Sequence, residues 1–81
     1  MNGTVKYLNR DDAMVAIETG DGAYTVAGMM EDYEIEVGDS ISGPLNADGA
    51  VELTNDSKGT PMTAYIEDTG ASEEFARTHV G

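Results

Sequence analysis

The all-β character of the chain is clearest in residues 3–18, which read GTVKYLNRDDAMVAIE. Strict alternation over residues 3–9 predicts a strand with Val5 and Tyr7 on one face, which would place Tyr7 beside Val5 in the core. A polar turn follows, and residues 13–18 predict a second strand. The two segments therefore indicate an antiparallel hairpin at the start of the domain.

Four further short segments continue this pattern and are separated by turns rich in glycine and aspartate, including Gly20-Asp21-Gly22 and Asn46-Ala47-Asp48-Gly49. The predicted strands cover residues 23–27, 40–45, 50–54 and 61–67. The side chains expected to face inward are Val15 and Ile17 in residues 13–18, and Val51 and Leu53 in residues 50–54. In residues 40–45 the inward positions are Ile41, Gly43 and Leu45. Residues 28–38 are interpreted as a long acidic loop with room for a short helical turn. Five or six strands at this spacing are typical of an all-β barrel or sandwich.

The end of the chain carries the signals of a short helix. Ser72 is a suitable N-cap, Glu73 and Glu74 follow in the first turn, and Arg77 comes later. So short a helix persists only if Phe75 and Val80 contact the barrel. We therefore divide the chain into a domain over residues 1–67 and a tail over residues 68–81, with docking of the tail left open.

The composition excludes several classes of protein but does not identify the function. The chain has 81 residues, a net charge of −12 and no cysteine, so it forms one small domain without a disulfide framework. Its longest apolar run, residues 14–17, is far too short for a membrane helix, and its first residues lack the pattern of a signal peptide. We expect a monomeric cytoplasmic protein that does not contact a membrane.

No constellation of residues predicts catalysis. The single histidine, His79, lies in the tail, and adjacent acids such as Asp11-Asp12 and Glu73-Glu74 are expected among 16 carboxylates. The residues around Gly49 lack the full spacing of a calcium loop. No glycine-rich phosphate loop follows a strand. We expect no enzymatic activity, no metal and no cofactor.

The opening segment Gly3-Thr4-Val5-Lys6-Tyr7-Leu8-Asn9 resembles the first strand of cold-shock domains, which reads Gly-x-Val-Lys-Trp-Phe-Asn in that family. The segments Glu36-Val37-Gly38-Asp39 and Lys58-Gly59-Thr60-Pro61-Met62-Thr63-Ala64 are similar to later family motifs. The resemblance spans residues 2–67, with residues 47–55 as an insertion. It implies a small antiparallel barrel of OB type that binds single-stranded RNA or DNA.

The departures from the family fall where its ligand binds. The second-strand motif Lys-Gly-Phe-Gly-Phe-Ile is matched here by residues 12–17, which carry neither aromatic ring, and residues 23–26 keep only one ring. Each base–aromatic stack contributes about 1–3 kcal/mol, so a weakened platform is implied. By the resemblance, the reduced nucleic-acid site consists of Lys6, Tyr7, Asn9, Arg10, Met14, Tyr24 and Lys58.

Three functional hypotheses follow. The first is weak binding of single-stranded nucleic acid through the residues just named, although the net charge repels a polyanion. The second is an acidic adaptor that binds a basic protein through residues 31–36, with Met29, Met30 and Tyr33 as apolar anchors. The third is mimicry of nucleic acid by carboxylates, of which the candidates are Asp21, Glu31, Glu34, Asp48 and Glu52.

Overall fold

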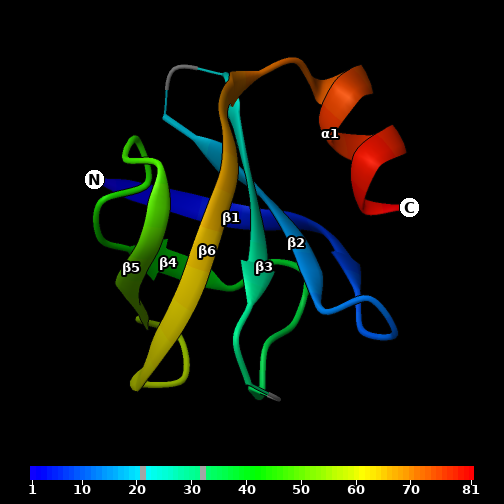
Figure 1. Ribbon diagram of the computed structural model, residues 1–81. Helices are drawn as coiled ribbons and strands as arrows, with labels where there is room; N and C mark the ends of the chain where they lie inside the picture. Colours follow the sequence, from blue (N-terminus) through cyan, green and yellow to red (C-terminus); the bar gives the residue numbers. More distant parts are fainter. Residues whose placement is uncertain (21, 32) are drawn as a thin grey trace.

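A computed structural model describes residues 1–20, 22–31 and 33–81 of the chain, and these residues form a closed antiparallel barrel of six strands followed by one helix (Figure 1). The elements are β1 (Asn2–Asn9), β2 (Met14–Thr19), β3 (Tyr24–Met29), β4 (Ser40–Ser42), β5 (Gly49–Asn55), β6 (Thr60–Ala71) and α1 (Glu73–Val80). The prediction of a small all-β, OB-like barrel with a short C-terminal helix is confirmed.

The strands follow one another around the barrel in the order β1-β2-β3-β6-β5-β4, and β4 closes the circle against β1. The longest strand, β6, pairs with β5 over residues 60–66 and with β3 over residues 64–71. The predicted end of this strand at Glu67 is wrong, because β3 offers partners as far as the pair Tyr24–Ala71. Residues 68–71 therefore belong to the barrel and not to a tail.

An irregularity in β1 changes the predicted orientation of Tyr7. Val5 pairs with Ile17, but Tyr7 pairs with the next residue of β2, Ala16, so one extra residue lies between the two pairs as a β-bulge. The bulge breaks the alternation. Val5 stays in the barrel interior, whereas Tyr7 packs in a cluster on the outside. The prediction that Tyr7 lies beside Val5 in the core is therefore wrong.

The barrel interior contains most of the apolar residues that alternation placed inward. Its buried members are Val5, Val15, Ile17, Ala27, Ile35, Ile41, Leu45, Leu53, Met62, Ala64 and Ile66. The strand β4 is shorter than predicted, because Gly43 adopts a φ of +140° and turns the chain away from the ladder after Ser42. The segment interpreted as an insertion, residues 47–55, contains the whole of β5 and is an integral part of the barrel wall.

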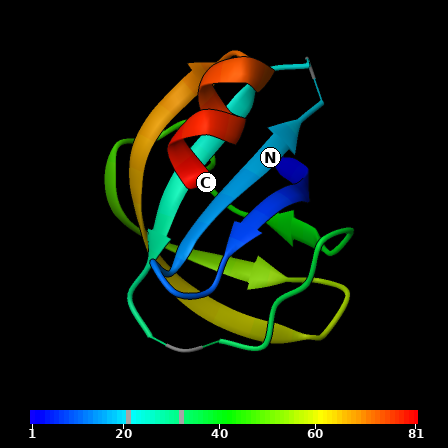
Figure 2. The ribbon, with the colours of Figure 1, turned by 90° about the vertical axis from the view of Figure 1, so that its right-hand side faces the viewer.

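The helix α1 lies against the outer face of β1, β2 and β3 (Figure 2). Ser72 is its N-cap, as predicted, and its hydroxyl accepts a hydrogen bond from the Phe75 amide at 3.1 Å. The helix buries Ala76 and Val80. Of the two residues whose contact with the barrel was the condition for a stable helix, Val80 is buried, whereas Phe75 is 45% exposed and stacks on His79.

The described residues of the connection between β3 and β4 contain no helix, and the connection ends in a turn in which the Asp39 amide donates to the Glu36 carbonyl at 3.1 Å. Two residues of the predicted loops, Asp21 and Asp32, lie outside the described part of the chain. Within the described ranges no helix has the length and apolar character required to cross a membrane.

Candidate functional site

Two of the residues predicted to bind nucleic acid, Tyr7 and Tyr24, lie side by side beneath α1. Their ring centroids are 6.2 Å apart with an interplanar angle of 31°. Both hydroxyls point to Oε2 of Glu73 in the first turn of α1, at 2.9 Å for Tyr7 and 3.5 Å for Tyr24. Tyr24 is buried and Tyr7 is half-buried. The helix thus covers the aromatic pair.

The contact with Glu73 also affects how the two tyrosines titrate. The hydrogen bond to its carboxylate raises the pKa of Tyr7 above 10.0, and burial acts in the same direction. Burial is the main cause that raises the pKa of Tyr24, followed by the negative charges of Glu18 and Glu73. Both hydroxyls therefore remain protonated donors at neutral pH, so that they can hold the carboxylate of α1.

Two further predicted residues, Asn9 and Met14, also serve the docked helix. The side-chain amide of Asn9 donates to the Val80 carbonyl at 3.0 Å, which satisfies a carbonyl at the end of α1, and to Asp12 at 3.2 Å. Met14 packs against the apolar cluster between the sheet and α1. In this structure neither side chain forms an open ligand platform.

The predicted cations are each engaged by a different partner. The Lys6 ammonium lies 3.6 Å from Glu18, Lys58 lies 2.7 Å from Glu36 and 3.3 Å from Asp39, and Arg10 donates to the carbonyl of Ile35. The hydrogen bond to Glu36 is the main cause that raises the pKa of Lys58 above 10.5. The structure therefore distributes these residues instead of gathering them into one basic patch beside the tyrosines.

Sequence reasoning missed a polar network around Asp39, a buried residue just before β4. Its Oδ2 accepts from the Glu36 amide at 2.9 Å and from the Asn55 side chain at 2.8 Å, while Lys58 approaches Oδ1. The bond from Asn55 is the largest influence that lowers the pKa of Asp39 below 3.8. Asn55 is fully buried. The only signal in the sequence was a polar residue, Asn55, at an inward position of β5.

A hollow of about 370 Å³ with a mixed polar and apolar lining lies between the acidic loop after β3 and the turn after β1, and it is lined by Arg10, Ala13, Met29, Met30, Glu31 and Tyr33. Tyr33 is fixed in place, because its hydroxyl accepts from the Thr63 amide at 2.9 Å and approaches Glu31 at 3.4 Å. Met30 is 57% exposed, and its backbone amide donates to the Thr63 carbonyl at 3.1 Å. The exposed side chain of Met30 thus lies beside the ring of Tyr33 and the carboxylate of Glu31, which accepts from the Tyr33 hydroxyl.

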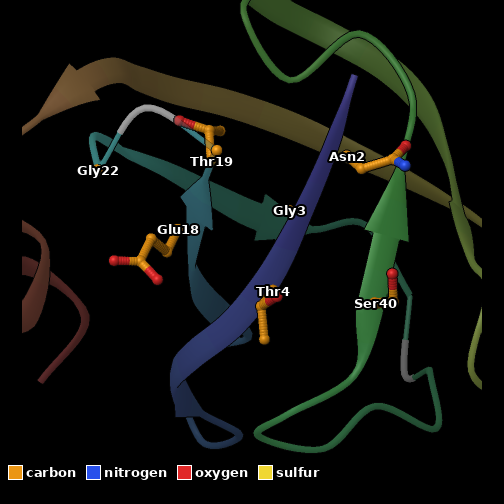
Figure 3. Close-up of a pocket in the computed structure, with 8 residues that line it drawn as sticks. Asn2, Gly3, Thr4, Glu18, Thr19, Gly22 and Ser40 are labelled. Atoms are coloured by element: carbon orange, nitrogen blue, oxygen red, sulfur yellow. The ribbon is translucent and has the colours of Figure 1, made fainter.

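A second hollow, of about 420 Å³, lies where β1, β2 and β4 adjoin (Figure 3). Figure 3 shows Glu18, Thr4 and Ser40 projecting from these three strands. Its lining is small and polar, with one carboxylate that pairs with Lys6. Within the described ranges no group of three His, Asp or Glu side chains is arranged to hold a metal ion.

His79, the one histidine, lies in the last turn of α1 with its side chain partly exposed. Its ring stacks on Phe75 with centroids 5.3 Å apart, and its Nε2 lies 3.6 Å from Glu67 on β6. The contact with Glu67 therefore helps to attach α1 to the barrel.

Four of the five carboxylates considered for mimicry of nucleic acid lie in the described chain. Glu31 and Glu34 lie in the loop after β3, Asp48 immediately precedes β5, and Glu52 lies within β5. Asp21 is outside the described residues. The four described candidates for mimicry of nucleic acid thus come from two separate segments of the chain, the loop after β3 and the region of β5.

Comparison with known proteins adds no assignment: no family model matches the chain, and neither a curated protein nor a solved structure matches it significantly.

Proposed function

We propose that this protein is a non-enzymatic binding module that recognises a basic protein segment through its acidic surface. The observation that carries the proposal is the combination of a net charge of −12 with the engagement of Lys6, Arg10 and Lys58 by acidic or carbonyl partners. Such a surface attracts cationic partners and repels polyanions.

The loop after β3 is the place where this attraction is combined with apolar contact. Met29, Met30 and Tyr33 line the hollow, and Glu31 lies at its edge. Methionine adapts its shape to different partners, and a fixed tyrosine is a typical anchor in protein interfaces. The partner is therefore a segment with an apolar side chain for the hollow and lysine or arginine on either side.

Charge reversal tests this site. In Glu31→Lys/Glu34→Lys we expect the affinity for a synthetic peptide of lysines around one leucine to fall by at least about tenfold, since charge complementarity sets such contacts. Calorimetry at low and high salt gives the readout, because screening weakens surface attraction. The control Asp48→Lys/Glu52→Lys changes the net charge equally but alters exposed residues at β5. Equal losses in both variants would contradict a localised site.

Binding of single-stranded RNA or DNA is the second candidate function, and the adjacent rings of Tyr7 and Tyr24 favour it. It requires that α1 leave these rings, because Tyr24 is only 3% exposed. Titration with oligo-dT and oligo-U at low salt, followed by tyrosine fluorescence, tests this candidate. Saturable quenching would support it, and an unchanged signal would reject it.

A further inference from the structure

The molecule has two separate apolar clusters, and only one of them involves α1. The interior cluster of the barrel consists of residues from the strands and their connections. The second cluster lies on the outer face, where Ala16, Tyr24 and Val26 contact Ala76 and Val80. Removal of α1 would therefore expose the second cluster without opening the barrel interior.

The attachment of α1 is narrow. Of its eight residues only Ala76 and Val80 are buried, and polar contacts join it to the barrel: Glu73 to the tyrosines, His79 to Glu67, and the Val80 carbonyl to Asn9. A helix of this length is not stable alone in water, so it unfolds when it leaves the sheet. Only Ser72 separates β6 from α1, and Gly70 near the end of β6 has a φ of +64°. These features describe a segment that can open as a unit while the barrel stays folded.

We propose that the outer face of β1, β2 and β3 is a docking surface for a short helix, which α1 occupies in the free protein and which an equivalent helix of a partner protein occupies after displacing it. Without α1, the buried residues Ala16, Tyr24 and Val26 would form an exposed apolar face, and such faces mark sites of protein contact. The proposal concerns a different surface from the acidic loop and does not depend on the function proposed above.

The bound α1 defines the chemistry of the partner helix. Ala76 is fully buried, so only a small side chain fits where the helix lies closest to the sheet. Val80, four positions later, lies on the same side of the helix and fills the cluster. Glu73, three positions before Ala76, provides the carboxylate that accepts from Tyr7. The preferred ligand is a helix with an acid, a small residue and a branched residue at this spacing.

The proposal is tested by adding a peptide with the sequence of residues 72–81 to the full-length variant Ala76→Asp and to the wild type. The substitution places a carboxylate in the apolar cluster, and α1 should leave the face. We expect the peptide to bind this variant at least about tenfold more tightly than the wild type, in which α1 competes for the same face. Amide shifts of Ala16, Tyr24 and Val26 should return toward their wild-type positions. Absence of these shifts at millimolar peptide would overturn the proposal.

Two further measurements separate docking from nonspecific effects and from misfolding. A peptide with aspartate in place of its alanine should not bind, and equal binding of both peptides would overturn the proposal. Hydrogen exchange of the wild type should show that the Gly81 amide, bonded to the Arg77 carbonyl, opens at least about tenfold more often than the Val5 amide, bonded to the Asp39 carbonyl. Equal protection of the two amides would show that α1 leaves the sheet only when the whole barrel unfolds, and this result would overturn the proposal.

Discussion

Replacement of Asp39 by alanine is expected to lower the free energy of unfolding by about 2–4 kcal/mol, because it leaves buried donors without an acceptor. Asn55 is fully buried and donates to Asp39, as does the amide of Glu36. Lys58 also loses one of its two carboxylate partners. Urea denaturation at neutral pH provides the measurement. The control Asp56→Ala removes an exposed acid that accepts a surface hydrogen bond from Ser42, and a loss as large as that of Asp39→Ala would contradict the assigned role.

The same network predicts a specific dependence on pH. The pKa of Asp39 is lowered in the folded state, so its charged form stabilises the fold above the ordinary pKa of 3.8. As the pH falls below that value, the unfolded chain takes up the proton first and this contribution is lost. The difference in stability between the wild type and Asp39→Asn should therefore be constant near neutrality and shrink below about pH 4. A difference that is independent of pH would show that the charge is not involved.

Replacement of Gly3 by alanine is expected to cost about 1–3 kcal/mol through overpacking. An added Cβ would lie 2.5 Å from Cγ2 of Ile17 and 2.8 Å from the carbonyl oxygen of Glu18. The carbonyl belongs to the paired strand β2, so it cannot move without disturbing the ladder. Thermal unfolding followed by circular dichroism measures the effect.

Gly20 offers the matched control, because a Cβ added there meets no atom within 4 Å and its φ is not in the left-handed region. Gly20→Ala should leave the stability unchanged or raise it by up to about 1 kcal/mol, since it restricts the unfolded chain. A destabilisation of Gly20→Ala equal to that of Gly3→Ala would show that close packing at Gly3 is not the cause.

Local sequence patterns were sufficient to predict that the strands and the helix exist, but not where β4 and β6 end. The alternation in residues 13–18 placed Val15 and Ile17 inward because it is a property of each strand by itself. The N-cap at Ser72 is equally local. The bulge that turns Tyr7 outward depends on how β1 pairs with β2, and the length of β6 depends on β3. Both features depend on a second strand, so the sequence pattern of one strand alone cannot predict them.

The candidate site was harder to predict for the same reason. Tyr7, Met14 and Tyr24 lie in the outer cluster that α1 contacts, and Asn9 donates to the last carbonyl of the helix. That contact joins positions up to 71 residues apart. The hollow beside Met30 could be anticipated from its run of methionines and acids. The network at Asp39 could not, since its acid is one among 16 in the sequence.

The claim that the acidic loop, and not the sheet face, is the binding surface of the free protein is tested most directly by parallel NMR titrations at low salt. One series uses the lysine peptide with a central leucine, and the other uses oligo-dT. We predict amide shifts at Met29, Met30, Glu31 and Tyr33 with the peptide and unchanged spectra with oligo-dT. Shifts at Tyr7 and Tyr24 with oligo-dT, together with no response to the peptide, would contradict the account.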